Sequence, residues 1–484
     1  MTKAPSGNRR SRVLALCIAG LIGMVVAFFE VELMRGRGAW RDYEREALGR
    51  GVRLKFSDYI PPPIPDAENF ASTPIFDAIF QASDAGQTPV NPFTFVQYVS
   101  EPKLSDLWSQ RQTDLSVWRQ FLVKEKVLPK AGENEAADVL LALQRFDPLL
   151  LELREAGKRP HCRFPVHWEK LFNASLPHLG TLQTAADRFA LRLSAHLSLG
   201  DSPAAYQDFH DGLRLATATR EEPSIISGLV RLSIEAKMLN CVWDGLGKRQ
   251  WAAPELQQIE ADLSGLDWLS DYVFSMNCQR GSSNEIMDTI IRDPSAYSQT
   301  LGNLSGMERY VRVYPTGWIY QSKLRNNRFL DELIARMEPG QHRFFGQRPV
   351  PSSAANLVSV PQRIHYLLFF FMSGPLESIE TKYLQGATMT DEARIACALE
   401  CFRQKKGAYP ESLAELAPEF IAELPAEVVN GEPYRYRRTK DGLFLLYSVG
   451  TDLRDDGGVV NPALRPYKQA DWIWSYPPQH PPAP

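Results

Sequence analysis

The hydrophobic pattern of the chain begins with an uninterrupted apolar run from Val13 to Phe29, which carries no charged residue. Its 17 residues lie at the short end of what spans a bilayer, and apolar residues at positions 31, 33 and 34 can extend it. The run therefore predicts a transmembrane helix over residues 13–34, behind a basic tail at residues 1–12.

A cleaved signal peptide is the alternative interpretation, because Val25-Val26-Ala27 offers small residues for a cleavage site. We favour an uncleaved anchor, since the run is longer than a usual signal-peptide core. Basic residues flank the run on both sides, but the short tail with Arg9, Arg10 and Arg12 favours a cytoplasmic N-terminus. We therefore expect a single-pass protein of the inner membrane whose bulk is extracytoplasmic.

After the run, the chain changes to charged and Pro-rich sequence over residues 35–67, which predicts a juxtamembrane helix and then a linker. Phe70, Ile75 and Phe80 then indicate the start of the globular part. Ser105–Val127 is a further helical candidate.

Apolar residues recur at helical spacing almost throughout Glu135–Leu266. This pattern predicts helices over Leu182–Leu199, Ala204–Thr217 and Glu255–Leu263, and another that begins at Pro223. The stretch LSLGDSPAAYQDFHDGLRLA resembles tetratricopeptide-like repeats, and the resemblance implies an irregular helical array that binds protein segments. A helical core with no binding role is the alternative.

The following region, residues 267–385, is predicted to contain helices over Glu285–Arg292 and from Trp318 through Ile334. The apolar run Tyr366–Met372 is too short to span a bilayer. We expect it to be a buried helix that packs the middle region onto the C-terminal part.

The C-terminal region predicts a small mixed module. Asp391–Lys406 has a helical stripe, with Thr390 as N-cap and Gly407 as the terminating residue. A short helix is expected over Glu411–Ala417. Asp441-Gly442 between two aromatic and apolar runs predicts a β-hairpin with a type I′ turn, whose strands are 434–438 and 443–448.

These elements resemble the C-terminal half of the major pseudopilin of type II secretion systems, through ALE at 398–400, GAYP at 407–410, GEPYRYR at 431–437 and LYSVGTD at 446–452. The resemblance implies a calcium ion in the loop 452–458, with Asp452, Asp455 and Asp456 as metal ligands. An acidic surface turn is the alternative. The chain departs from the family at its N-terminus, where the apolar run precedes Glu30 and Glu32 and no pseudopilin leader occurs. Pilus assembly is therefore not expected.

Composition and cysteine usage narrow the function classes. The net charge of −3 provides no general basic field for nucleic acid. Cys397 and Cys401 lie four residues apart, which fits a disulfide poorly and predicts small buried helix residues. His161, Cys162 and His167 suggest a metal site, but a fourth ligand is not evident, and a loop anchored by Trp168 is the alternative.

Catalytic motifs do not occur, so the sequence predicts no catalytic residue. Taken together, the patterns predict a mainly α protein with a transmembrane helix, an irregular helical array at 68–266, and a small α+β module with a β-hairpin at 386–476 before a Pro-rich tail. The function that we expect is that of a membrane-anchored scaffold with protein partners. The alternatives are a component of a type II secretion-like apparatus and an extracytoplasmic hydrolase.

Overall fold

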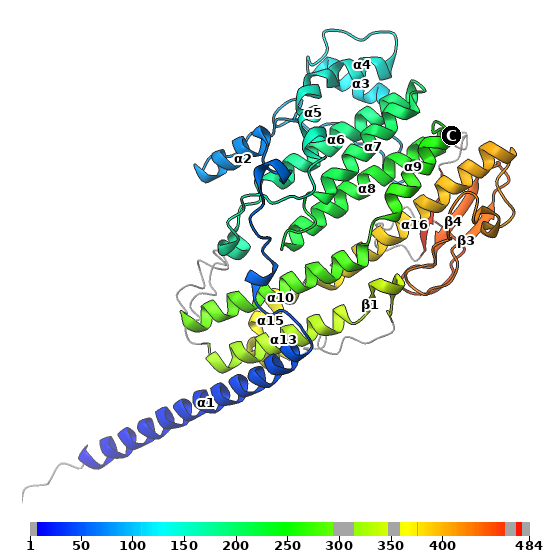
Figure 1. Cartoon of the computed structure of the whole chain (residues 1–484). Helices are drawn as coiled ribbons and strands as arrows, with labels where there is room; N and C mark the ends of the chain where they lie inside the picture. Colours follow the sequence, from blue (N-terminus) through cyan, green and yellow to red (C-terminus); the bar gives the residue numbers. More distant parts are fainter. Residues whose placement is uncertain are drawn as a thin grey trace, which may run out of the picture.

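The computed structural model describes residues 7–107, 109–293, 314–346, 359–374, 376–459 and 471–476. This part of the chain is mainly helical, with small antiparallel sheets towards the C-terminus, as the sequence predicts (Figure 1). Its helices are α1 (Gly7–Gly49), α2 (Pro74–Asp84), α3 (Leu115–Lys124), α4 (Glu135–Leu143), α5 (Asp147–Ala156), α6 (Pro177–Ser198), α7 (Ser202–Thr217), α8 (Ile225–Gly247), α9 (Ala253–Ser264), α10 (Trp268–Arg292), α13 (Thr316–Ile334), α14 (Val360–His365), α15 (Leu367–Ser373) and α16 (Leu376–Lys406).

Helix α1 joins the predicted span and the juxtamembrane segment in one helix of 43 residues. Its N-terminal part is apolar and exposed, and is long enough to cross a membrane. Its C-terminal part packs on α13 through a small core that includes Trp40, Tyr43 and Ala47. Figure 1 shows α1 projecting from one end of the molecule.

Helices α6, α7, α8 and α9 pack side by side in the middle of the molecule (Figure 1). Local signals set their boundaries. The side chain of Asp201 accepts a hydrogen bond from the amide of Ala204 at the start of α7, and Ser224 does the same for α8. Such caps satisfy backbone donors that the helix itself leaves free. The predicted helices of this region are confirmed, but α6 begins at Pro177 rather than at Leu182.

The C-terminal sheet has the order β3-β4-β5 and is antiparallel throughout. Its strands are β3 (Arg435–Arg438), β4 (Phe444–Ser448) and β5 (Trp472–Trp474), and a separate two-stranded sheet joins β1 (Met337–Glu338) to β2 (Arg343–Phe344). The predicted hairpin is confirmed, but its turn is not type I′. The amide of Thr439 bonds to Leu443 O, and of the three residues between them only Gly442 has a positive φ. This is the geometry of a three-residue hairpin loop.

Several predicted boundaries are wrong. Helix α16 begins at Leu376, so Thr390 lies inside the helix and is not its N-cap. Helix α10 begins at Trp268 rather than near Glu285. Only residues 115–124 of the candidate Ser105–Val127 are helical. The short helix expected over Glu411–Ala417 is a 3-10 turn at Leu413–Leu416. The end of α16 is as predicted, since Gly407 has φ +87°.

The C-terminal module shares its core with the helical array. Ile395, Leu399 and Trp474 belong to the same buried cluster as residues of α6–α9. The indole Nε1 of Trp243 in α8 donates to Ser475 O at 2.8 Å, and its ring stacks on Tyr476. The buried run in α15 packs on α13 and joins a cluster that contains Val449 and Trp472, as expected from its hydrophobicity.

Candidate functional site

An open groove lies between α8 and α16, with the first turn of α10 at its floor. It encloses about 260 Å³. Leu229, Leu232 and Ala236 of α8 form one wall, and Met389 of α16 lies on the other. The groove also has Ser233, Trp268, Lys382, Gln385 and Gly386 in its lining. Most of the lining is therefore apolar.

A glycine on α16 allows the floor of the groove to form. A Cβ at Gly386 would overlap the ring of Trp268. Because glycine has no Cβ, the indole lies directly against α16, where its Nε1 donates to Thr390 Oγ1 at 2.9 Å. This hydrogen bond satisfies a buried donor, and it fixes the orientation of the ring.

A buried ion cluster holds α8 against α10 behind the groove. The Nε of Arg231 donates to Glu235 Oε1 at 2.9 Å, and its Nη2 pairs with Asp271. Arg231 and Glu235 are almost completely buried. Burial raises the pKa of Glu235, and the charge of Arg231 opposes that shift. Removing one member of such a buried network is destabilising, because it leaves an uncompensated charge.

The groove carries little charge among the described residues that line it. Among the described residues that line it, Lys382 is the only one with an ionisable side chain, and it is exposed at the rim. A general acid and base pair would need two such groups within reach of one substrate. The arrangement fits an apolar segment that carries an acidic group.

The predicted calcium ligands lie in a loop that makes its own hydrogen bonds. Asp455 Oδ1 accepts from Tyr447 Oη and from the Gly457 amide, both at 2.9 Å, and Asp452 Oδ1 accepts from the Arg454 amide at 3.1 Å. The backbone amide of Asp456 donates to the carboxylate of Asp471. These bonds hold the loop against β5. No cluster of three His, Cys, Asp or Glu side chains arranged for a metal occurs in the described part of the chain, so calcium stays a prediction.

Asp471, which contacts this loop, is not among the residues that the sequence predicts. Its carboxylate accepts hydrogen bonds from the amides of Asp456 and Gly458, at 3.4 and 2.8 Å. Burial raises its pKa. Asp471 directly precedes β5, which is an edge strand of the sheet. The apolar sequence of Trp472–Trp474 could have indicated this strand, and with it the position of Asp471.

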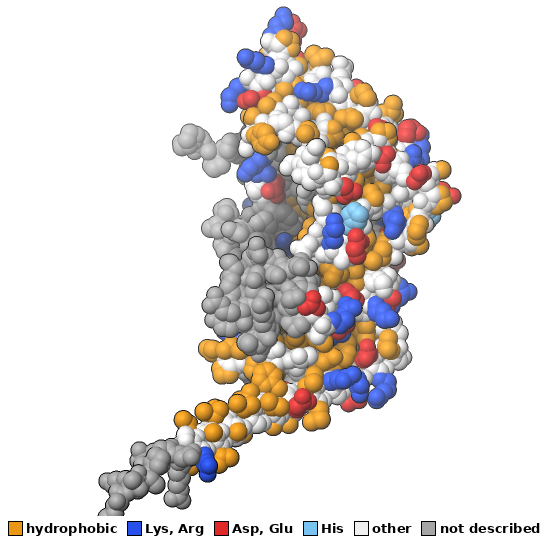
Figure 2. All heavy atoms as spheres, turned by 90° about the vertical axis from the view of Figure 1, so that its left-hand side faces the viewer, with side chains coloured by type: hydrophobic (Ala, Val, Ile, Leu, Met, Phe, Trp, Pro, Cys, Tyr) orange, Lys and Arg blue, Asp and Glu red, His pale blue; other side chains and the backbone are white. Residues whose placement is uncertain are grey.

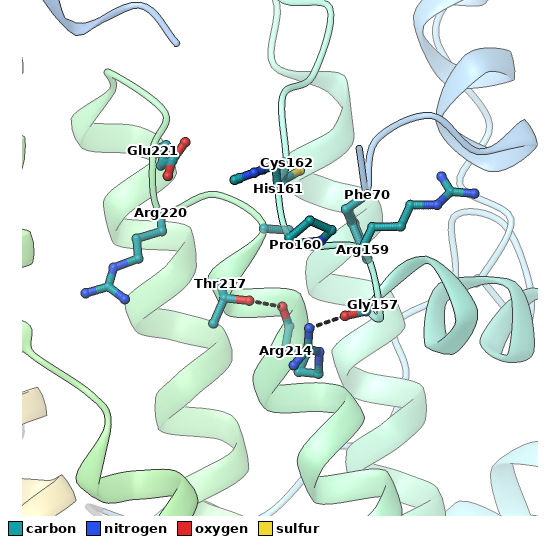
Figure 3. A pocket seen from close by; sticks show the side chains of 11 residues that line it. Phe70, Gly157, Arg159, Pro160, His161, Cys162, Arg214, Thr217, Arg220 and Glu221 are labelled. Carbon is teal, nitrogen blue, oxygen red and sulfur yellow. Dashed lines mark hydrogen bonds between the residues drawn. The ribbon is translucent and has the colours of Figure 1, made fainter. Parts of the chain in front are cut away.

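A second cavity, of about 250 Å³, lies beside His161 and Cys162 (Figure 3). Three arginines line it, but each guanidinium has another partner. Arg159 donates to Asn69 O and Ser72 O, Arg214 donates to Gly157 O, and Arg220 pairs with Asp271. In Figure 3 the side chains of Arg159 and Arg220 extend away from the cavity. These contacts fix the positions of the three guanidinium groups.

The cysteine and the two histidines of this region do not form the suggested metal site. His167 pairs with Glu169 at 3.1 Å, and His161 bridges to Asn69 through its backbone. Burial and the charges of Glu222 and Glu221 raise the pKa of Cys162, so its reactive thiolate form is disfavoured. The six cysteines are all unpaired, and Cys397 and Cys401 are buried helix residues, as predicted.

Three buried acids under the C-terminal sheet were also missed. Glu392 and Glu427 are fully buried, and Asp391 nearly so. Asp391 accepts hydrogen bonds from Tyr434 Oη and pairs with His342, each at 2.9 Å, whereas both carboxyl oxygens of Glu392 lack a hydrogen-bond partner among the described residues. Burial, with the charges of Glu427 and Asp391, holds the pKa of Glu392 well above its usual range. A neutral carboxyl group is therefore expected here.

No match to this chain was found among protein-family models, curated proteins or solved structures.

Proposed function

We propose that this protein is a single-pass, membrane-anchored extracytoplasmic scaffold that binds a helical segment of a partner protein in the groove between α8 and α16. The observation that carries the proposal is an open apolar groove with one exposed cation, Lys382, among the described residues that line it. An amphipathic helix places apolar side chains every three or four residues, which suits such a groove. An acidic residue beside those side chains would pair with Lys382.

The anchor part of the proposal is supported by α1. Its exposed apolar residues have no core to enter within the described part of the molecule, and a bilayer would cover them. Figure 2 shows these side chains along the projecting helix. The basic N-tail favours an orientation with the groove outside the cytoplasm.

A photocrosslinking experiment tests the groove. We would place a photoreactive phenylalanine analogue at Ser233, which is exposed in the groove, in the full-length protein in its native membrane. The matched control is the same analogue at Leu151, an exposed position on α5. We expect a specific adduct from position 233 only, identified by mass spectrometry as a helical segment.

A second variant makes the outcome decisive. Leu229→Asp places a charge on the apolar wall, and we expect it to abolish the adduct without changing membrane anchoring. Lys382→Glu should weaken the adduct several-fold by repelling an acidic partner. Equal adducts from positions 233 and 151, or an adduct that survives Leu229→Asp, would overturn the proposed binding site.

A second candidate function, a component of a type II secretion-like apparatus, is suggested by the resemblance of residues 398–452 to the major pseudopilin. The same adduct tests it. A secretion component as the captured protein would support this candidate, and any other partner would count against it.

A further inference from the structure

The two helices α1 and α13 cross in close backbone contact where the apolar span ends. A Cβ at Gly36 would overlap Gly317 O, and a Cβ at Gly317 would overlap Glu32 O. Beside the crossing, the buried carboxylate of Glu32 accepts from Trp318 Nε1 at 3.1 Å and from Gln321 Nε2 at 2.8 Å. These packing contacts therefore fix the domain to α1 within one turn of the span.

This attachment places one end of the domain at the level of the bilayer surface. The ring of Phe28, inside the span, contacts the ring of Trp318 at a centroid distance of 6.1 Å. His365 lies against Trp318 at 4.7 Å, and Tyr314 Oη donates to His365 O. A chain of aromatic contacts thus joins the span to the last residue of α14.

The surface at this end carries exposed apolar side chains. Val360 and Ile364 of α14 are 69% and 54% exposed, and Phe371 of α15 is 36% exposed. Arg35 and Arg37 are exposed on α1 immediately after the span. Figure 2 shows hydrophobic side chains on the end of the domain from which α1 emerges.

We propose that this end of the domain, formed by α14, the start of α13 and α15, rests in the interface of the same bilayer that α1 crosses. Tryptophan and tyrosine are enriched at membrane–water interfaces, and Trp318 and Tyr314 lie at this end. Val360 and Ile364 would enter the boundary between headgroups and acyl chains, and Arg35 and Arg37 would meet anionic headgroups. The inference rests on the proposed anchor.

A lipid surface fits this end better than a protein partner does. The apolar patch is continuous, through Trp318 and Phe28, with the bare apolar surface of α1. The close crossing at Gly36 and Gly317 holds the patch beside the span. The patch can therefore contact the bilayer without a further loss of orientational entropy.

Spin labelling of the full-length protein in nanodiscs with anionic lipid tests the proposal. A nitroxide on Ile364→Cys would be compared with one on Leu151→Cys, which replaces a side chain of the same 54% exposure on α5. Cys17→Ser and Cys162→Ser remove the two cysteines that are not buried. We expect the label at position 364 to be accessible to oxygen and protected from a water-soluble nickel complex, and the label at position 151 to show the reverse.

The native Cys17 separates the two hypotheses. In a Cys162→Ser background, a nitroxide on Cys17 lies inside the predicted span and reports on the anchor alone. A buried label at position 17 with a water-exposed label at position 364 overturns the interface proposal and leaves the anchor intact. A water-exposed label at position 17 overturns both. Burial of position 364 that occurs only when a second protein is added would also overturn the lipid assignment.

Discussion

Glu427 is a buried carboxyl group whose protonation is coupled to folding. Its Oε2 accepts from Asn430 Nδ2 and Ser448 Oγ, at 3.0 and 3.3 Å, while Oε1 lacks a partner among the described residues. Burial raises the pKa of Glu427 to about 7, against the lowering effects of the Val449 amide and of Arg435. The folded state therefore binds a proton more tightly than the unfolded state does.

The stability of the protein should fall between pH 4.5 and pH 7 because of this group. Since the pKa is raised on folding, its contribution is fully present below the unfolded pKa and is lost as the pH rises to about 7. We expect Glu427→Gln to raise the unfolding free energy at pH 8 by about 1–3 kcal/mol relative to the wild type, and to change it little at pH 4.5. Denaturant unfolding at several pH values measures this.

The control is Glu432→Gln, an exposed carboxylate in the neighbouring turn. It should leave the pH dependence unchanged. Equal slopes of stability against pH for Glu427→Gln and the wild type would show that Glu427 is ionised in the folded protein.

The acidic loop gives a prediction about metal binding. The calcium hypothesis requires that the ion bind the folded state only, so calcium should raise the melting temperature and a chelator should lower it. Asp452→Ala with Asp456→Ala should abolish the shift, because it removes two of the predicted ligands. Neither side chain is needed for the contacts that Asp455 makes with Tyr447 and Gly457, so those contacts should remain. A wild-type melt that does not change with calcium would show that the loop is only a surface turn.

Gly386 allows the Trp268 ring to lie against α16 at the floor of the groove, so substituting it should change the stability of the protein. Gly386→Ala should displace the Trp268 ring and cost about 1–3 kcal/mol of unfolding free energy, as overpacking does. Gly180→Ala in α6 is the matched control, because nothing lies near the new Cβ. Thermal melts compare the two. A Gly386→Ala variant as stable as the control would mean that the floor of the groove can repack.

At the scale of elements, the sequence was most informative where local signals and tertiary contacts agree. Helix α7 follows a capping Asp201 and has a proline in its first turn, and its predicted start at Ala204 lies close to the observed start at Ser202. The start of helix α16 could not be predicted in the same way. Its first half contains Gly386 and buried Thr388 and Thr390, residues with low helix propensity, and its stability there comes from contacts with α8 and α10.

The same reason explains why the candidate site was found only in part. The acidic loop stands out in the sequence because its three aspartates are near one another, whereas the groove combines Leu229, Trp268 and Met389 from three helices. No local pattern brings these residues together. The burial of Glu392 was not predicted. Glu392 is the second residue of the predicted helix Asp391–Lys406, where an acidic residue is ordinarily exposed in the first turn.

The crossing of α1 and α13 gives a prediction at this scale. Gly317→Ala should force the two helices apart, since its Cβ would overlap the backbone of Glu32. We expect a lower melting temperature and faster proteolysis after the span, between residues 35 and 53. Gly38→Ala, in the other helix of the pair, α1, is the control, because the added methyl meets open space there. If Gly317→Ala is cleaved no faster than Gly38→Ala, the rigid attachment of the domain is wrong.

At the scale of the whole molecule, the helical array and the C-terminal module should unfold as one unit. Phe444 and Trp474 lie in the same buried cluster as Trp243 and Leu246 of α8. Removing the C-terminal module therefore exposes a large apolar surface on the helical array. We expect a fragment that ends at Asp293 to lose a cooperative thermal transition and its near-ultraviolet circular dichroism, while it keeps helical signal. Full-length protein in the same detergent is the control and should melt in a single transition. A fragment that melts cooperatively would mean that the array folds on its own, and the shared core would then be a docking interface between two independently stable parts.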